Sequence, residues 1–370
     1  MKIENLLDTK NLISRIDEGM ITFQEHPTLP LRVYNYTHEA QQVPPLEWDR
    51  EMSLCRGLIV DDKGLVVARP FPKFWNYGQT GAAELKGIPE VTEKLDGSLG
   101  IYWCYKGERG IATRGSFTSE QALWATEWFR KNLGYLSWPD PLMTPLFEII
   151  YGKNQIVVKY PFEGLVLLSF IDIETGLEPP YSVIESTANH QKIPVVSKFN
   201  KTIAECLAED KTNKEGYVLT WKPMSLPALR VKVKFAEYVR LHKLLTGVSP
   251  KAIWEVLAKD RLEGLMKMTE GTPMEFNMWV DKWTRRMQAD KRDIETRAIR
   301  VYLEFICSLD IKLSDRLSER EMRKMAAAHF TKFTDLAPIL FRIWDGDSYE
   351  DILWKMVKPK GTDTFKRDEG

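Results

Sequence analysis

The stretch at residues 93–98 reads Glu-Lys-Leu-Asp-Gly-Ser and stands directly before an apolar, aromatic run at residues 99–105. That run predicts a strand, and Asp96-Gly97 is typical of a tight turn. Lys94 would then stand at the end of the strand before the turn. A plain turn between two strands explains the same residues. The functional alternative is a nucleophilic lysine, which attacks only as the free amine and therefore needs an apolar or cationic environment.

Charged residues recur on the faces and at the ends of other predicted strands. Residues 229–235 alternate, so Arg230, Lys232 and Lys234 would project from one face of a strand. Glu148 lies within an apolar strand and Glu215 stands directly before another, where a carboxylate is costly without a partner. Lysines on a lone strand are usually solvated. In combination, these residues predict a site in which Lys94 has partners of both signs.

Short β-branched or aromatic runs bounded by Gly, Pro or Asp fill the first two-thirds of the chain. They predict strands near residues 57–62, 64–69, 98–106, 110–115, 145–152, 154–160, 165–173, 216–221 and 229–235. Fewer helices are expected, near residues 4–18, 118–133, 183–191 and 201–209. This mixture predicts an α+β domain whose sheets are mostly antiparallel.

Only helices are predicted beyond residue 236. Ser249 and Pro250 are typical of a helix start, apolar residues recur at helical spacing from 276 to 306, and Ser318 with Glu321 fits a capping box. We expect a boundary near residue 245, which gives an α+β domain at 1–245 and an all-α domain at 246–370. Residues 358–370 are expected to form a loose tail.

The composition excludes some classes of protein. The 370 residues include 52 Lys and Arg against 52 Asp and Glu, and 44% are hydrophobic. This argues against a disordered chain or a polycationic coat protein. The 4 cysteines form no C-x-x-C pair and suit a reducing cytoplasm. No signal peptide or membrane-length apolar run occurs, so a soluble intracellular protein without membrane contact is expected.

Charge is unevenly distributed along the chain. Residues 1–200 carry a net charge of −5, and residues 201–300 carry +6. The positive middle indicates an anionic partner, although solvated helix faces would explain it equally well.

Taken in order, the charged motifs resemble those of the covalent nucleotidyltransferase superfamily, which comprises polynucleotide ligases and mRNA capping enzymes. They are K-x-D-G-S at 94–98, F-E-I at 147–149, E-G-Y-V at 215–218 and V-K-V-K at 231–234. The closer resemblance is to the RNA ligase 1 family, typified by the tRNA-repair ligase of T-even phages. Further elements that resemble this family lie at residues 32–36, 51–57, 69–76, 114–123, 154–158 and 237–242.

This resemblance covers about residues 25–245 and implies a nucleotidyltransferase fold of the ATP-grasp-like ligase type. DNA ligases and capping enzymes carry a β-barrel after the lysine strand, whereas this chain continues with predicted helices. In the RNA ligase 1 family that helical domain resembles a tRNA-docking element, so an RNA-docking role is implied for residues 246–370.

The resemblance implies catalytic roles for the matched residues. Lys94 would take AMP from ATP, and Asp96 and Glu148 would face the ribose or the metal. Glu215 would lie near the reacting lysine and the metal. The full implied catalytic set is Lys94, Asp96, Glu148, Glu215, Lys232 and Lys234. The implied metal ligands are Glu148, Glu215 and, in the helical domain, Glu263.

Nucleotide binding is implied for a wider set of residues. Lys232 and Lys234 would flank the α-phosphate and favour the free amine of the reacting lysine. Arg56 and Lys73 would bind nucleotide phosphates or the RNA 5′-phosphate. The full implied set is Tyr34, Arg56, Lys73, Trp75, Lys94, Glu148, Lys232, Lys234 and Tyr238.

The chain departs from the family pattern at several positions. Arg114 stands where family members often have Lys, and Trp75 stands where they have Phe. The base-stacking aromatic should fall near residues 165–172, where only Phe170 is aromatic. Tyr34, Trp75 and Tyr238 could alternatively be core residues, and Glu263 a solvated residue on a helix.

The implied function is that of an ATP-dependent RNA ligase that joins RNA 5′-phosphate and 3′-hydroxyl ends through lysyl-AMP and RNA-adenylate. Mg²⁺ is the expected cofactor, with Mn²⁺ as an alternative. The expected substrate is single-stranded RNA or a nicked tRNA anticodon loop, in RNA repair. An end-healing kinase-phosphatase would act upstream, because the chain has no P-loop. A monomer in a bacterial or phage-infected cytosol is expected.

Other functions stay open at this point. A GTP-dependent capping enzyme and a DNA ligase share the motifs, although the missing β-barrel argues against both. A catalytically inactive RNA-end binding module, or a purely structural protein, would require the complete set of motif residues to be unused.

Overall fold

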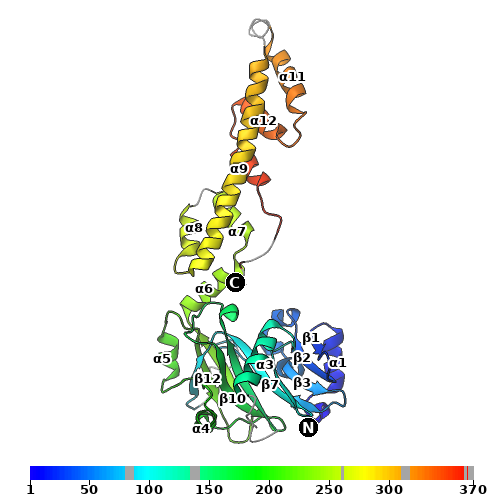
Figure 1. Cartoon of the computed structure of the whole chain (residues 1–370), viewed down its shortest axis with the longest axis vertical. Helices are drawn as coiled ribbons and strands as arrows, with labels where there is room; N and C mark the ends of the chain where they lie inside the picture. Colours follow the sequence, from blue (N-terminus) through cyan, green and yellow to red (C-terminus); the bar gives the residue numbers. More distant parts are fainter. Residues whose placement is uncertain (80–86, 134–141, 260–261, 310–316, 362–364, 366–370) are drawn as a thin grey trace. The chain divides into compact units, whose positions relative to one another are not determined.

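The computed structural model of the chain describes residues 1–79, 87–133, 142–259, 262–309, 317–361 and 365. It divides into two compact units, Met1–Arg240 and Leu241–Gly370. The boundary lies within helix α6 (Ala236–Gly247), in the region where the sequence changes from strands to helices. Figure 1 shows sheets in the first unit and helices in the second.

Three sheets form the framework of the first unit, and all but one of their strand pairs are antiparallel. The first sheet is a meander of β1 (Ile21–Glu25), β2 (Leu31–Tyr36), β3 (Arg56–Asp61) and β4 (Val66–Ala68). The second has the order β10-β9-β7-β8, formed by β7 (Ser98–Tyr105), β8 (Glu108–Ala112), β9 (Met143–Ile150) and β10 (Gly164–Asp172).

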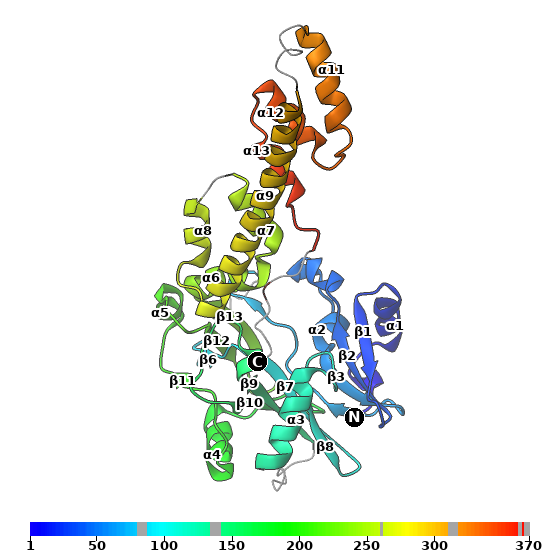
Figure 2. The ribbon, with the colours of Figure 1, turned by 45° about the horizontal axis from the view of Figure 1, so that its top comes forward.

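The third sheet carries four of the basic residues that the sequence predicted for the site, namely Lys94, Arg230, Lys232 and Lys234. Its order is β11-β6-β12-β13-β5, formed by β5 (Trp75–Asn76), β6 (Glu90–Lys94), β11 (Lys198–Phe199), β12 (Gly216–Trp221) and β13 (Leu229–Lys234). Among the strand pairs that the structure describes in this sheet, only β13 and β5 run parallel. Figure 2 shows β6, β12 and β13 side by side.

The register of this sheet places residues of β6, β12 and β13 opposite one another in three rows on one face, which we name the central face. Gly216 lies opposite both Lys94 and Lys234, Val218 opposite Thr92 and Lys232, and Thr220 opposite Glu90 and Arg230. Residues opposite one another share a face, and that face repeats every second residue. The alternation predicted for residues 229–235 is therefore confirmed, and it brings the three basic residues of β13 to the same face as Lys94.

Helices cover one face of the second sheet, and the first sheet covers the other. On the helical side, Phe129 of α3 and Ile184 of α4 pack with Phe147 and Leu165 of the sheet. On the other side, Val33 and Ile59 of the first sheet pack with Ile101 and Leu146. The α-helices of this unit are α1 (Thr9–Asp17), α2 (Arg50–Leu54), α3 (Glu120–Leu133), α4 (Tyr181–Gln191) and α5 (Ile203–Ala208). This arrangement confirms the predicted α+β class.

One predicted strand is wrong. Residues 154–160 form no strand, and the short 3₁₀ helix Gly152–Asn154 leads into irregular backbone. The reason is a side chain distant in sequence: the carboxylate of Asp96 accepts hydrogen bonds from the backbone N–H groups of Val157 and Val158. The β-branched residues are buried as a strand would bury them, but their amides bind Asp96 and not a neighbouring strand.

The second unit is helical throughout its described part, and no described residue beyond β13 is in a strand. Its helices are α7 (Pro250–Leu257), α8 (Leu262–Thr269), α9 (Met274–Ser308), α11 (Glu319–Phe330), α12 (Ala337–Asp345) and α13 (Glu350–Met356). The Ser249 hydroxyl caps α7, and Ser318 and Glu321 form the predicted capping box of α11. A core on α9 includes Phe305, Phe330 and Ile339.

The expectation of a loose C-terminal tail is wrong for the residues that the structure describes beyond α13. The Lys358 ammonium lies over the Trp254 ring at 4.8 Å. The Phe365 ring contacts the rings of Phe276 and Trp279 near the start of α9, at centroid distances of 5.3 and 5.7 Å. Aromatic contacts of this kind offset the conformational entropy that keeps most chain ends loose.

Among the described residues, no helix combines the length and the apolar character that crossing a membrane would require.

Candidate active site

Two lysines share one buried carboxylate at the head of the third sheet. The Lys94 ammonium lies 2.9 Å and the Lys234 ammonium 2.8 Å from the same Glu215 oxygen. The Glu215 side chain is only 3% exposed, whereas both lysines reach solvent in part. A carboxylate buried in this way is stable because two cations bind it. The sequence prediction grouped these three residues, and the structure brings them together.

Gly216 makes this close approach of β12 and β13 possible. Its φ is +148°, and a Cβ at this position would lie 1.9 Å from the Val233 carbonyl oxygen. Any other residue would push β13 away or twist Glu215 out of reach. The residue after the buried carboxylate is therefore fixed by backbone geometry.

Lys232 lies in a cluster of positive charges. Burial, together with the neighbouring cations Lys94, Lys234, Lys73 and Arg56, lowers its pKa to about 7. Such a cluster is unfavourable unless an anion joins it. A polyanion such as a nucleotide phosphate chain would relieve the repulsion among these side chains.

Glu148 of β9 faces the same cluster. Its pKa is raised to about 8, mainly by burial: the Lys94 ammonium opposes the rise, and the carboxylates of Glu215 and Asp96 contribute to it. A carboxyl group with this pKa takes up or releases a proton near neutral pH, or it binds a cation. Gly97 allows the approach, since a Cβ there would lie 2.5 Å from the Ile149 carbonyl oxygen.

Asp96 is buried and its carboxylate is fully engaged by protein groups. One oxygen accepts from the backbone N–H of Val157 at 2.9 Å and of Val158 at 2.8 Å. The other accepts from the Tyr238 hydroxyl at 2.7 Å. The structure thus brings Asp96 and Tyr238 together as partners of each other. The implied contact of Asp96 with ribose or metal stays a prediction.

A cavity of about 180 Å³ begins at Lys94 and follows the central face of the third sheet. Its walls combine apolar side chains, such as Leu99, Leu168 and Val218, with charged ones, such as Glu148 and Arg56. A slot that offers both apolar and polar wall groups can bind a ring system with polar edges.

The far end of this cavity is closed by a buried ion pair. The Arg230 guanidinium binds the Glu178 carboxylate, and both side chains are almost fully buried. Arg230 also lies over the Phe71 ring at 4.0 Å, and the Ser169 hydroxyl donates to Glu178 at 2.8 Å. Arg230 is therefore part of the cavity end, away from the Lys94 amine.

A second group of cations surrounds the Tyr36 hydroxyl. Arg114 donates to it at 2.6 Å and Lys73 lies 3.3 Å from it. Although burial raises the pKa of Tyr36, the charges of Arg56, Arg114 and Lys73 outweigh burial and lower it. The Lys73 ammonium is also enclosed by the Tyr36, Trp48 and Trp75 rings, at 4.7, 5.1 and 4.7 Å. This group can bind phosphate oxygens.

Two of the implied nucleotide-binding aromatics lie in different surroundings. Trp75 belongs to the cage around Lys73, where its ring meets that of Trp48. Tyr34 packs against the apolar core beside α1 and its ring lies 5.5 Å from Phe23. Tyr34 does not line the cavity at Lys94. Its role in nucleotide binding stays a prediction.

Glu263 lies in α8, in the second unit. Its carboxylate binds Lys267 one turn along the helix at 2.9 Å, and its side chain is 81% exposed. Within the described parts of the chain, no group of three or more His, Cys, Asp or Glu side chains could by itself hold a metal ion. The implied role of Glu263 as a metal ligand stays a prediction.

The sequence profile of a family described as RNA ligase matches residues 54–239, half of the chain. The chain belongs to this RNA ligase family. The match includes every residue of the implied catalytic set, from Lys94 to Lys234. It ends inside α6, so the helical unit lies outside it.

Individual relatives carry corresponding designations. A protein of Thermovibrio ammonificans designated an RNA ligase is 32% identical over 227 residues, which are 57% of this chain and 58% of that protein. A protein of Autographa californica nuclear polyhedrosis virus designated a bifunctional polynucleotide kinase/RNA ligase is 27% identical over 265 residues. That match covers 63% of this chain and 36% of the viral protein. The chain therefore spans between about a third and three-fifths of the length of these relatives.

Among solved structures, an archaeal ATP-dependent RNA ligase is similar at a TM-score of 0.43 with 14% identity. The alignment covers 77% of this chain and 79% of that chain.

Sequence reasoning missed Tyr36 at this RNA ligase family site. It selected Tyr34, two positions earlier on the same strand. The two tyrosines differ in their position relative to the end of β2. Tyr36 is the last residue of the strand and contacts Lys73 in the loop between β4 and β5, whereas Tyr34 lies opposite Leu58 of β3. A strand end cannot be placed to within two residues from sequence alone.

Proposed function

We propose that this member of the RNA ligase family is an ATP-dependent RNA ligase that joins a 5′-phosphate to a 3′-hydroxyl. The observation that carries the proposal is the shared Glu215 carboxylate, which holds Lys94 and Lys234 at 2.9 and 2.8 Å beside the cavity that Lys94 lines. A lysine held in this way can attack a phosphorus atom bound between it and the nearby cations.

In the first step the Lys94 amine attacks the α-phosphorus of ATP. A P–N bond forms, the bond to the β-phosphate oxygen breaks, and pyrophosphate leaves; the displaced lysine proton passes to solvent or a nearby base. Lys232 and Lys234 stabilise the negative charge on the α-phosphate during the displacement. The cations around Tyr36 are suited to hold the departing phosphates.

In the second step an oxygen of the RNA 5′-phosphate attacks the same phosphorus. The P–N bond breaks, Lys94 regains its amine, and a 5′–5′ phosphoanhydride joins AMP to the RNA. In the third step the RNA 3′-hydroxyl attacks the 5′-phosphate of that RNA-adenylate, its proton leaves, and AMP departs. Lys232 can stabilise each transfer, because all three reactions develop charge on phosphate oxygens.

The residues present suit a divalent cation. Glu148 is a carboxyl group whose pKa of about 8 reflects burial beside Glu215 and Asp96, so a bound cation would stabilise its ionised form. Mg²⁺ is commonly held by one or two carboxylates together with substrate phosphates. Glu148 and Glu215 would be its protein ligands, with Mn²⁺ as an alternative ion. Such an ion neutralises phosphate charge when bound.

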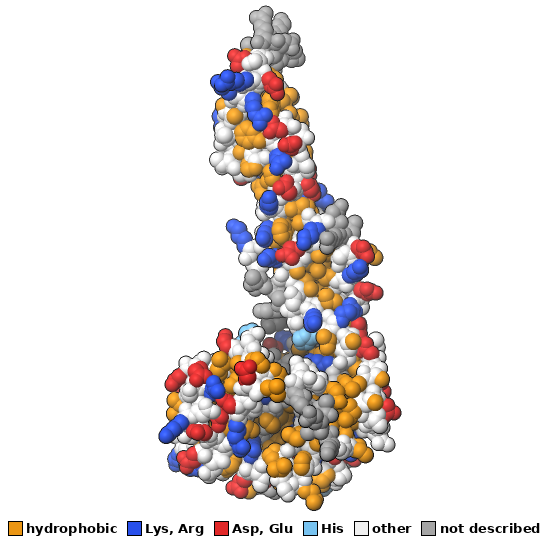
Figure 3. All heavy atoms as spheres, turned by 180° about the vertical axis from the view of Figure 1, so that it is seen from behind, with side chains coloured by type: hydrophobic (Ala, Val, Ile, Leu, Met, Phe, Trp, Pro, Cys, Tyr) orange, Lys and Arg blue, Asp and Glu red, His pale blue; other side chains and the backbone are white. Residues whose placement is uncertain are grey.

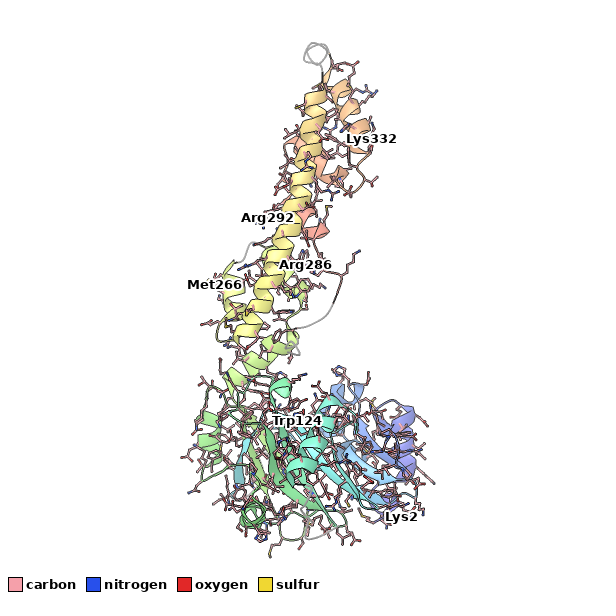
Figure 4. The ribbon with its side chains drawn as sticks, viewed as in Figure 1. Lys2, Trp124, Met266, Arg286, Arg292 and Lys332 are labelled. Carbon is pink, nitrogen blue, oxygen red and sulfur yellow. The ribbon has the colours of Figure 1, made fainter. Side chains whose placement is uncertain are left out.

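The helical unit is proposed to dock RNA, with single-stranded RNA or a nicked tRNA anticodon loop as the substrate. Arg286 and Arg292 of α9 are exposed and form no ion pair with any residue that the structure describes (Figure 4). Figure 3 shows Lys and Arg interspersed with Asp and Glu along this unit, which suits limited contact with phosphates and not tight coating. We further propose that the protein acts as a monomer in the cytoplasm, downstream of a separate end-healing kinase-phosphatase.

Incubation with α-³²P ATP tests the proposed chemistry. The wild-type protein is expected to become labelled, and Lys94→Ala to remove all label, because Lys94 both binds Glu215 and lines the cavity, whereas Lys234 binds Glu215 without lining the cavity. Lys10→Ala is the matched control, since Lys10 is an exposed lysine of α1. Persistent labelling of Lys94→Ala would overturn the assignment.

The same preparation decides the substrate class. Joining of 5′-phosphorylated single-stranded RNA and nicked tRNA is expected, with ATP preferred over GTP. Sealing restricted to nicked DNA duplexes, or labelling by GTP alone, would contradict an RNA ligase while keeping the lysine chemistry.

A further inference from the structure

A second cavity meets the first at the turn that follows Lys94. Its volume is about 260 Å³ and it is lined by Asp96 and by residues 150–152, 154–155 and 160–163. Leu95 and Gly97 of the same turn line the first cavity. The turn is therefore a common wall, with the proposed nucleotide pocket on one side and this cavity on the other.

The chain segment 152–163, which we name the outer loop, is fastened to that turn. Asp96 accepts from the amides of Val157 and Val158, and the Asp96 amide donates to the Tyr160 hydroxyl at 2.7 Å. The Ser98 hydroxyl donates to the Asn154 side chain at 3.0 Å. A ligand on the outer loop would consequently be held at a fixed place relative to Lys94.

The outer loop presents an aromatic ring to solvent. Phe162 is 41% exposed, and its ring meets the Tyr160 ring at a centroid distance of 5.8 Å and 61°. The Phe162 ring is thus supported by Tyr160 and remains partly open to solvent. Exposed rings supported in this way are stacking platforms for unpaired bases.

The outer loop also carries two exposed lysines. Lys153 and Lys159 are exposed, and neither forms an ion pair with any residue within the described ranges. The backbone of Lys159 is braced by Asn213, whose side chain accepts from its amide at 2.7 Å and donates to its carbonyl at 3.0 Å. A supported, exposed ring on the same segment as two unpaired cations is a combination that single-stranded nucleic acid can use.

We propose that the outer loop binds the 3′-terminal nucleotides of the acceptor RNA, with the last bases on Phe162 and their phosphates near Lys153 and Lys159. This inference rests on the proposed ligase function. The 5′-phosphate and AMP have the cations around Lys232 and Tyr36, so the 3′-hydroxyl strand is the substrate that still needs a site. It must reach phosphorus beside Lys94, and the outer loop is bonded to the turn of that lysine.

Photocrosslinking tests the site without requiring catalysis. An RNA that ends in a 3′-terminal 4-thiouridine, irradiated with the full-length protein in the absence of ATP, is expected to crosslink to residues 151–163, as read by peptide mass spectrometry. Phe162→Ala should lower the yield about tenfold, since one base stack is worth about that factor. Phe162→Trp should retain it. Crosslinks confined to other segments would overturn the proposal.

A step-resolved assay provides the second readout. With pre-adenylated donor RNA, Phe162→Ala and Lys153→Ala/Lys159→Ala should raise the KM for acceptor RNA about tenfold and leave the labelling by ATP unchanged. The matched controls are Leu123→Ala, an exposed apolar residue of α3 (56% exposed), and Lys10→Ala/Lys131→Ala. Unchanged KM values in both variants would overturn the proposal.

The proposed function is scored separately by label transfer from ATP to the wild-type protein. A wild-type protein that takes no label contradicts the ligase chemistry, while the crosslink position still decides where an RNA 3′ end binds.

Discussion

Lys232 shows how a single side chain connects stability with chemistry. Its pKa of about 7 results from burial and from the surrounding cations, and both effects disfavour its charged form in the protein without ligand. Phosphate oxygens would restore the charge. The same surroundings that disfavour the charged form of Lys232 in the free protein therefore favour the binding of an anion.

Replacing Lys232 by methionine should flatten the dependence of stability on pH. Between pH 7 and the ordinary lysine pKa of 10.5 the unfolded chain binds the proton that folded Lys232 has lost, so stability rises with pH across this window. Glu148 has the opposite effect at lower pH: because its pKa is raised from 4.5 to about 8, stability decreases as the pH rises between these two values. The informative range is therefore pH 8 to 10. There the wild-type Tm should rise with pH relative to that of Lys232→Met.

The same variant should be more stable than the wild type at pH 8, by about 2–4 °C in Tm, and should form lysyl-AMP about 100-fold more slowly. Differential scanning fluorimetry and the labelling assay measure the two effects. Lys10→Met serves as the exposed control. Parallel Tm profiles for Lys232→Met and the wild type would show that Lys232 keeps its proton in the folded protein.

At the scale of elements, the site depends on the register of three strands. Lys94, Gly216 and Lys234 form one row, and the next row contains Lys232. A shift of one residue in β13 would move both of its lysines to the opposite face. The position of Gly216, where a Cβ would lie 1.9 Å from the Val233 carbonyl oxygen, holds this register tightly.

Gly216→Ala should consequently impair the site without removing any charged group. We expect lysyl-AMP formation to fall at least 100-fold, because a displacement of about 1 Å is enough for such a loss, and the Tm to drop. The matched control is Gly247→Ala in α6, where an added Cβ meets nothing within 4 Å. Near-normal labelling by Gly216→Ala would show that β13 tolerates the displacement.

The sequence predicted these strands well where the pattern was local. Alternation in residues 229–235 indicated the common face of Lys232 and Lys234, and the register confirms it. The pattern failed for residues 154–160, since the partner of the Val157 and Val158 amides is a carboxylate about sixty positions earlier. No local periodicity carries information about such a partner. The outer loop and its exposed Phe162 were therefore not predicted.

At the scale of the whole molecule, composition and texture indicated an α+β part followed by helices, and the structure confirms this class. What could not be predicted is how distant segments meet. Tyr36 and Lys73 come from different elements and join only through the fold. The C-terminal segment, expected to be loose, brings Phe365 to α9.

Phe365→Ala tests whether this end of the chain stabilises the helical unit. Losing its contacts with Phe276 and Trp279 should cost about 1–2 kcal/mol of unfolding free energy and speed limited proteolysis of residues 241–370. Met266→Ala is the control, because Met266 of α8 is 73% exposed (Figure 4). Equal proteolysis rates for the two variants would show that the aromatic contacts contribute nothing measurable.

The Glu215 carboxylate, held by two ammonium groups, has a consequence for the proton inventory of the proposed cycle. When Lys94 gives up its proton and takes AMP, one ammonium remains on the shared oxygen, so the buried anion never stands alone. The group of three side chains then passes from one net positive charge to none, and returns when the lysine is freed. Lys94 would therefore release one proton and take one up in each turnover, while Lys234 keeps the Glu215 carboxylate paired.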